Sequence, residues 1–199
     1  MSKDWLLLKH RDRFASTTAL PDVSVLSGRT VQEVRDGESH LEEITRALKQ
    51  SQALKRDPKL ANLSPMLCQA ADEVPDGKEW IYEIKYDGYR LLSEKRDSAI
   101  CLQSRRGHDV SAQFPEIVRA LKLLPCQSAI FDGEVIVEDE RGRSHFERLA
   151  RRAKVSRPAD IARAEIAEPV RYAIFDLLAF GGFDLRPLPL ILRKQLLRR

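Results

Sequence analysis

The chain has 199 residues, of which 43% are apolar and 32% charged, so it is long enough for one or two domains with a hydrophobic core. A net charge of +4 and a pI near 9.0 permit nucleic acid as a partner without requiring it. The three cysteines and four histidines show no metal-ligand spacing, which argues against a disulfide framework and a zinc site. No apolar run is long enough for a transmembrane helix or a signal peptide, so we expect no membrane association and a cytoplasmic protein.

Positive charge is concentrated toward the C-terminus. Residues 141–199 contain fourteen Lys or Arg and six Asp or Glu, whereas the rest of the chain is net acidic. Such a basic segment either forms a solvated surface or contacts a polyanion, and composition alone does not decide between these two roles.

The first part of the chain predicts few regular elements. A short strand is expected over residues 4–12, and a loop over residues 20–30. An amphipathic helix is predicted over residues 39–54, because apolar residues recur there at helical spacing. Pro58 and Pro65 end this pattern, and we place a domain boundary directly after Pro58.

Strands and helices alternate in the remainder of the chain. The segment 79–96 predicts two strands around a turn at Asp87–Gly88. Adjacent strands with short turns favour an α+β fold with antiparallel sheets over a parallel one. The other predicted elements are strands at 99–107, 128–142 and 169–182, and helices at 112–125, 146–154 and 190–199.

The stretch EIKYDGYR, residues 83–90, has the pattern K-x-D-G-x-R, formed by Lys85, Asp87, Gly88 and Arg90. This pattern is either a polar turn with flanking charges or part of a catalytic site. A lysine nucleophile must be neutral to attack, and neighbouring cations such as Arg90 or a bound metal ion favour the neutral amine. Asp87 could orient the amine or bind a hydrated metal ion, and Gly88 would let the backbone approach a ligand closely.

The stretch KYDGYR resembles the first motif of the covalent nucleotidyltransferases, which include ATP-dependent DNA ligases, RNA ligases and mRNA capping enzymes. Three later stretches resemble further motifs of that family in the same order: SRRG with Arg105, FDGE with Glu134 and FDLL with Phe175. Each stretch alone has an ordinary explanation, namely a solvated charge, the end of a hairpin and a core aromatic residue. Their common order and spacing identify the chain as a member of this family.

The resemblance implies an adenylation site. Lys85 would attack the α-phosphate of ATP, and Asp87 would act beside it as a second catalytic residue. Glu134 and Asp87 would bind Mg²⁺ or Mn²⁺. Glu83 and Phe175 would contact the adenine. The full set of ATP-binding residues implied by the resemblance is Glu83, Lys85, Arg90, Arg105, Glu134 and Phe175.

The stretches WLLLKHRD and PMLCQAADEVPDGKEW make the resemblance closest to the ligase domain of bacterial DNA ligase D. It implies that residues 1–58 are a remnant of an upstream phosphoesterase-like domain plus a helical linker. Residues 59–199 would be the N-terminal part of an α+β adenylation domain with antiparallel sheets and flanking helices. The implied function is the sealing of DNA nicks and ends through a lysyl-AMP intermediate in non-homologous end joining, in the cytoplasm at the nucleoid, with bacterial Ku as a partner.

Complete members of the family carry later E-G-x-x-x-K and K-x-K motifs and an OB-fold domain. The chain shows neither lysine motif after Phe175, so we expect an incomplete adenylation domain. A catalytically inactive nucleotide- or DNA-binding fragment therefore stays open as the alternative, because phosphoryl transfer depends on complete positioning of charge. An RNA ligase or capping enzyme shares the K-x-D-G core, but the ligase D-like N-terminus argues against it.

Overall fold

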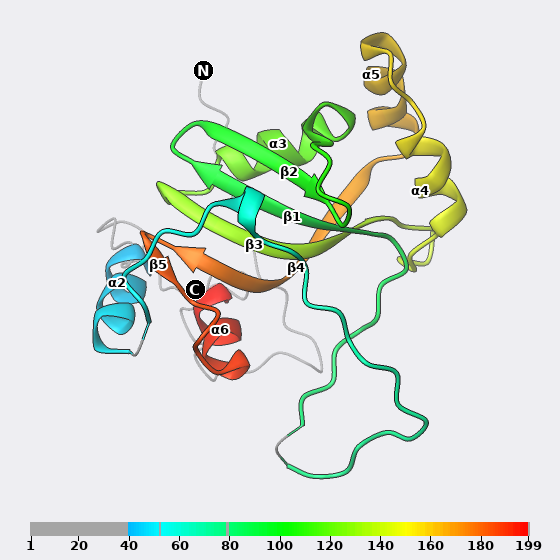
Figure 1. The fold of residues 1–199 in the computed structure, drawn as a ribbon. Coiled ribbons are helices and arrows are strands. Elements are labelled where there is room, and N and C mark those ends of the chain that lie inside the picture. Colours follow the sequence, from blue (N-terminus) through cyan, green and yellow to red (C-terminus); the bar gives the residue numbers. More distant parts are fainter. Residues whose placement is uncertain (1–39, 52, 79, 199) are drawn as a thin grey trace, which may run out of the picture. The chain divides into compact units, whose positions relative to one another are not determined.

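The centre of the structure is an antiparallel sheet of five strands in the order β2-β1-β3-β4-β5 (Figure 1). The computed structural model describes residues 40–51, 53–78 and 80–198, and these residues belong to one compact unit. The strand and loop predicted at 4–12 and 20–30 lie outside the described residues. The strands are β1 (Tyr89–Arg96), β2 (Ala99–Ser104), β3 (Ser128–Val137), β4 (Val170–Phe180) and β5 (Phe183–Asp184).

Helices flank this sheet, so the predicted α+β class with an antiparallel sheet is confirmed. The four helices predicted within 39–54, 112–125, 146–154 and 190–199 are all present. The sequence pattern did not predict α5, whose single buried residue, Ile161, leaves too weak an apolar periodicity. The helices are α2 (His40–Gln50), α3 (Pro115–Lys122), α4 (Phe146–Ala153), α5 (Pro158–Ala167) and α6 (Leu190–Leu197), with 3₁₀ turns η1 (Leu60–Asn62) and η2 (Ser111–Gln113).

The main hydrophobic core lies on one face of the sheet. Leu91 of β1 and Val135 of β3 pack there with α3, which lies behind the sheet in Figure 1. Ile44 and Leu48 of α2 are buried in the same core, so the helix before Pro58 packs with the residues that follow it. The domain boundary after residue 58 stays a prediction.

The opposite face of the sheet is only partly covered by apolar residues. Leu60 and Leu63, in and after η1, cover Leu92 and Ile130 there, and Figure 1 shows η1 crossing the front of the sheet. Because side chains alternate along a strand, residues two places apart share a face, and Arg90 of β1 and Asp132 of β3 therefore present polar groups on the same face as Leu92 and Ile130. This polar part of the face carries the candidate site.

The predicted pair of strands around Asp87–Gly88 is wrong. Only β1 forms, it begins at Tyr89, and residues 80–87 contain no strand. The β1–β2 turn lies instead at residues 97–98, where Asp97 has a φ of 50°. A strand needs a neighbour for its backbone hydrogen bonds, and no strand of the described residues pairs with 80–87.

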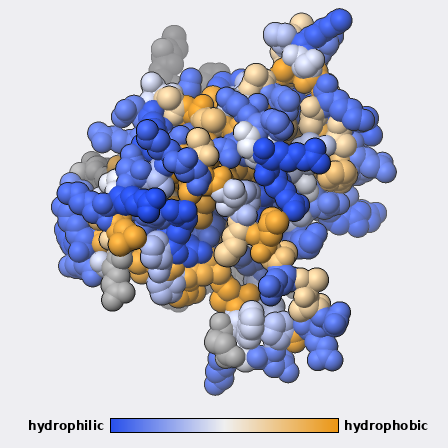
Figure 2. Space-filling model, viewed as in Figure 1, coloured by the Kyte–Doolittle hydropathy of each residue, from blue (hydrophilic) through white to orange (hydrophobic). Residues whose placement is uncertain are grey.

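The segment before β1 therefore leaves large apolar side chains at the surface. Figure 1 shows it as a long loop that extends away from the sheet, and Figure 2 shows apolar atoms among polar ones on its surface. Trp80 and Ile84 are 51% and 76% exposed. The loop leads directly into the stretch that carries Lys85.

Candidate active site

Phe175 lies at an irregularity in β4. Asp132 of β3 pairs with Asp176, and the next residue, Gly133, pairs with Ile174, so Phe175 has no partner on β3. An extra residue in one strand re-aims the neighbouring side chains, and such bulges are frequent next to active sites. The Phe175 ring is half-buried, and the guanidinium carbon of Arg90 lies 4.5 Å from its centroid.

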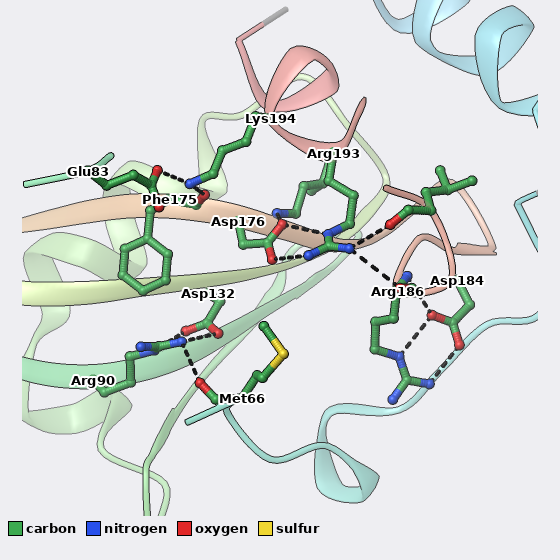
Figure 3. Close-up of polar contacts among 12 residues, drawn as sticks. Met66, Glu83, Arg90, Asp132, Phe175, Asp176, Asp184, Arg186, Arg193 and Lys194 are labelled. Atoms are coloured by element: carbon green, nitrogen blue, oxygen red, sulfur yellow. Dashed lines mark hydrogen bonds and ion pairs between the residues drawn. The ribbon is translucent and has the colours of Figure 1, made fainter. Parts of the chain in front are cut away.

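Arg90 and Asp132 form a two-point ion pair across β1 and β3 (Figure 3). Arg90 Nε donates to Asp132 Oδ1 at 2.6 Å, and Nη2 donates to Oδ2 at 2.8 Å. The backbone carbonyl of Met66 also accepts from Nη2, at 3.4 Å. Burial raises the pKa of Asp132, whereas the bond from Arg90 opposes this rise.

Glu134 lies directly opposite Arg90 in the β1–β3 register. Its side chain is half-buried, and burial raises the pKa of its carboxyl group. The charges of Arg90 and Lys85 and the backbone amide of Gly88 all act in the opposite direction. The structure therefore brings Lys85, Arg90, Glu134 and Phe175 to the same region of the sheet. Lys85 itself is exposed, and no side chain of the described residues accepts a hydrogen bond from it.

Close packing of the backbone against β3 requires glycine at position 88, whether or not a ligand is bound. A Cβ atom on Gly88 would lie 2.1 Å from the backbone oxygen of Val135, a distance that no side chain tolerates. Directly before it, the backbone amide of Asp87 donates to Ser144 Oγ at 3.1 Å. These two contacts attach the Lys85 segment to β3 and to the loop before α4. The Asp87 carboxylate is exposed and forms no hydrogen bond within the described part of the chain.

Arg105 is not in the strands that carry Arg90, Glu134 and Phe175. It occupies the exposed turn after β2, which is the edge strand next to β1. The turn is closed by a hydrogen bond from the Gly107 amide to the Ser104 carbonyl at 2.8 Å. No hydrogen bond or ion pair joins the Arg105 side chain to any described residue, and the side chain lies in an exposed turn.

The sequence interpretation did not include a group of polar residues that supports the site from α6. Lys194 donates hydrogen bonds to Glu83 Oε1 and to the Phe175 carbonyl, and Arg193 forms a two-point pair with Asp176 (Figure 3). Glu83 and Lys194 are 111 residues apart, so no local pattern could have joined them. Asp132 and Asp176 stand inside the quoted FDGE and FDLL stretches, which is the one local signal that pointed to them.

The described residues contain no preformed metal centre. Nowhere in these ranges do three His, Cys, Asp or Glu side chains come together in a way that could hold an ion. Glu134 is the predicted metal ligand that faces the charged cluster, whereas the Asp87 carboxylate is exposed. Mg²⁺ usually binds through one or two carboxylates together with substrate phosphates and water, and Glu134 is suited to that mode.

Taken together, the geometry suits the binding of a phosphorylated aromatic compound. It offers an exposed lysine, a half-buried aromatic ring, cations and a carboxylate at one part of the sheet. A model of a known family, described as "ATP dependent DNA ligase domain", matches residues 65–199. The chain belongs to the ATP-dependent DNA ligase domain family.

Relatives of this ligase family support the same assignment. The multifunctional non-homologous end joining protein LigD of Pseudomonas aeruginosa is 34% identical over 193 residues, which cover 94% of this chain and 21% of that protein. The bifunctional non-homologous end joining protein LigD of Bacillus subtilis is 37% identical over 132 residues, which cover 62% of this chain and 21% of that protein. The chain therefore spans about a fifth of the length of these two relatives.

Solved structures of ligase domains have a similar fold. A mycobacterial DNA ligase D complexed with ATP and MES matches with a TM-score of 0.59 and 30% identity, over 70% of this chain and 42% of that chain. The ligase domain of LigD from M. tuberculosis matches with a TM-score of 0.58 and 32% identity, over the same shares. The fold is thus that of part of a ligase nucleotidyltransferase domain. Within the described ranges, no helix is both long and apolar enough to cross a lipid bilayer.

Proposed function

We propose that this chain supplies the lysine nucleophile of an ATP-dependent DNA ligase and forms a covalent lysyl-AMP intermediate at Lys85. The observation that carries the proposal is the position of Lys85, three residues before Gly88, whose backbone lies directly against Val135 and Glu134 of β3 beside the Arg90–Phe175 cluster. Exposure of the lysine leaves its amine accessible to a nucleotide. Membership of the ligase family supports the choice of ATP as substrate.

The proposed first step is a substitution at phosphorus. The neutral Lys85 amine attacks the α-phosphorus of ATP, a nitrogen–phosphorus bond forms, and the bond to the bridging oxygen of the β-phosphate breaks. Pyrophosphate leaves with the electron pair, and the amine loses its proton to solvent. Phe175 would stack on the purine, Glu83 would contact its edge, and Arg90 and Arg105 would hold sugar and phosphates.

A divalent ion, Mg²⁺ or Mn²⁺, would neutralise phosphate charge when it is bound with the nucleotide. Glu134 is the residue we assign to it, and Asp87 is the second, more exposed candidate. Arg90 already donates from Nε and Nη2 to Asp132, so its contribution to the nucleotide would come from Nη1, for which the described residues supply no acceptor.

The later steps are proposed for a complete ligase that contains a domain of this kind. The AMP would pass from Lys85 to the 5′-phosphate of a DNA nick or end, and the 3′-hydroxyl would then displace AMP and close the strand. Because the LigD relatives are named non-homologous end joining proteins, we propose DNA ends as substrate, bacterial Ku as partner, and the cytoplasm, at the nucleoid, as location. The division into residues 1–58 and 59–199 is proposed on the same basis.

The test is the intact mass of the purified chain after incubation with ATP and Mg²⁺ or Mn²⁺. We expect a mass increase of one AMP in the wild-type chain and none in Lys85→Ala. Lys78→Ala is the matched control, because Lys78 is also exposed in the loop before β1 and should leave the adduct unchanged. An adduct that persists in Lys85→Ala would overturn the assignment of the nucleophile.

Absence of an adduct from a folded wild-type chain would instead favour the alternative of a nucleotide- or DNA-binding fragment without turnover. Binding through phosphate contacts would then weaken steeply as salt is added. A DNA titration at two salt concentrations separates that alternative from a chain that binds nothing.

A further inference from the structure

Lys194 of α6 joins two residues of the proposed adenine site that are distant in sequence. Its ammonium group donates one hydrogen bond to Glu83 Oε1 and another to the backbone carbonyl of Phe175 (Figure 3). The same ammonium lies 5.7 Å from the centroid of the Phe175 ring. Its side chain is 10% exposed, whereas that of Glu83 is 48% exposed. A buried cation therefore holds a carboxylate whose other side faces solvent.

The position of Lys194 is set by the residue before it. Arg193 donates from Nε and Nη2 to the two oxygens of Asp176, each at 2.9 Å, and from Nη1 to the Leu188 carbonyl at 2.7 Å. Leu196, on the same helix, is buried in the main core. These contacts attach α6 to β4 at the bulge. The Lys194 ammonium is consequently held beside Phe175 even before a nucleotide binds.

Glu83 has no comparable support from its own segment. It lies in residues 80–87, which form no helix or strand, and the described residues around it are exposed. The ion pair with Lys194 is the one hydrogen-bonding contact that the Glu83 carboxylate makes within the described ranges. Without Lys194, the carboxylate would rotate freely in solvent.

The chemistry of the pair discriminates between purines. An ionised carboxylate only accepts hydrogen bonds, so a fixed Glu83 can accept from the exocyclic amine of adenine and opposes the carbonyl oxygen of guanine at the same position. An ammonium group has three donors, and two of them are already used by Glu83 and Phe175. The pair thereby keeps the carboxylate oriented.

We propose that Lys194 is a positioning residue that holds Glu83 in the orientation that selects adenine over guanine nucleotides. The inference rests on the proposed function, since it takes the surface beside Phe175 as the adenine site. Its consequence is that base selection depends on α6, which lies more than a hundred residues after the lysine nucleophile in the chain.

The experiment measures equilibrium binding of ATP and of GTP to the full chain that carries Lys85→Ala, so that no covalent step contributes. Lys194→Met is then added and compared with Lys194→Arg, which keeps a cation with several donors. Arg198→Met is the matched control, because it removes one positive charge from an exposed position next to the same helix. Thermal melting of each variant confirms that it is folded.

We expect Lys194→Met to reduce the ratio of ATP affinity to GTP affinity about tenfold. A site that loses an oriented hydrogen-bonding group loses more of its selectivity between the two bases than of its affinity for either nucleotide. Lys194→Arg should restore most of the ratio, and Arg198→Met should leave it unchanged. If Lys194→Met lowers the affinities for ATP and GTP by the same factor, the inference is overturned and Lys194 is a purely structural residue.

Glu83→Gln gives an independent test, since the amide keeps the shape of the side chain but offers a donor as well as an acceptor. We expect this variant to bind ATP and GTP with similar affinity, and unchanged preference for ATP would contradict the inference. Selective binding without a Lys85 adduct in the wild-type chain would reject the proposed transfer alone. If the wild-type chain binds neither ATP nor GTP, both proposals are rejected.

Discussion

Arg90 of β1 and Asp132 of β3 face each other diagonally across two strands and share two hydrogen bonds, of 2.6 and 2.8 Å. The same guanidinium lies 4.5 Å from the centroid of the Phe175 ring. One side chain thus connects three strands of the sheet at the candidate site. Asp132 is almost fully buried, with its side chain 4% exposed, so its charge depends on Arg90 for compensation.

Arg90→Lys should destabilise the domain although it keeps the positive charge. A lysine cannot donate the two parallel hydrogen bonds and cannot lie flat against the Phe175 ring, so we expect a loss of about 1.5 kcal/mol in the free energy of unfolding. Urea unfolding monitored by circular dichroism measures it. The control is Arg143→Lys, because the Arg143 side chain, which pairs with Asp139, is 69% exposed and its change should stay within about 0.5 kcal/mol. A loss in Arg90→Lys no larger than in the control would contradict this role.

Glu134→Gln should make the domain more stable at neutral pH while it removes the proposed activity. Burial raises the pKa of Glu134 above its ordinary value of 4.5, so the folded state holds the proton more tightly than the unfolded state does. The group therefore lowers the free energy of unfolding progressively as the pH rises above 4.5. We expect Glu134→Gln to exceed the wild type in stability at pH 7 and to match it below pH 4.5 in urea titrations.

Asp184→Asn serves as the control of opposite sign. The hydrogen bond from Arg186 lowers the pKa of Asp184 below its ordinary value of 3.8. The ionised carboxylate therefore stabilises the folded state above that pH, and this stabilisation is lost as the pH falls. We therefore expect Asp184→Asn to be less stable than the wild type at pH 7. The same sign of change in both variants would show that burial does not dominate at Glu134.

Gly88→Ala should be strongly destabilising because the added methyl group has no space. Its Cβ atom would lie 2.1 Å from the Val135 oxygen and 2.9 Å from Ile136 Cγ2, so the β1–β3 pairing must open locally. We expect a loss of about 2–3 kcal/mol by chemical denaturation. Gly142→Ala is the comparison, since Gly142 has a φ of +74° but nothing within 4 Å, and its strain should cost only about 1 kcal/mol. The reverse order of the two losses would disprove the steric explanation.

Ser144→Ala should disturb the Lys85 segment more than the domain as a whole. The Ser144 hydroxyl accepts the hydrogen bond from the Asp87 amide, and its loss should cost about 1 kcal/mol of stability. If the proposed transfer occurs, we expect lysyl-AMP formation to slow about tenfold, because small displacements of a nucleophile have large effects on rate. Single-turnover transfer and hydrogen exchange of the Asp87 amide give the two readouts.

The matched control for that variant is Ser156→Ala, which alters an exposed serine between α4 and α5. It should change neither the exchange rate of Asp87 nor the transfer rate. Unchanged exchange at Asp87 in Ser144→Ala would show that the hydroxyl does not restrain the segment.

Long elements with strong local patterns were predictable from the sequence. The β-branched and aromatic residues of 128–137 favour a strand, and the sequence predicts helices over the segments of α3 and α6. The segment 80–87 was not predictable in this way. Its apolar residues favour a strand locally, but a strand forms only where a second strand supplies hydrogen bonds, and no described strand lies beside it.

The candidate site shows the same division. Lys85, Arg90, Glu134 and Phe175 stand in short stretches that the family resemblance identifies, and the structure brings them to one face of the sheet. The bulge at Phe175 depends on how β4 aligns with β3, which is a relation between two distant segments. No residue type in FDLL by itself specifies that alignment.

The sequence by itself determined the α+β class, the family and the stretch that carries the proposed nucleophile, Lys85, because these depend on local propensity and on the order of short motifs. Only the tertiary structure decided which groups support that stretch. The packing of α6 brings Lys194 to Glu83, 111 residues earlier in the chain. The packing of the loop before α4 likewise brings Ser144 to the amide of Asp87, 57 residues earlier. Contacts of that kind are set by the packed core as a whole and leave no pattern in neighbouring residues.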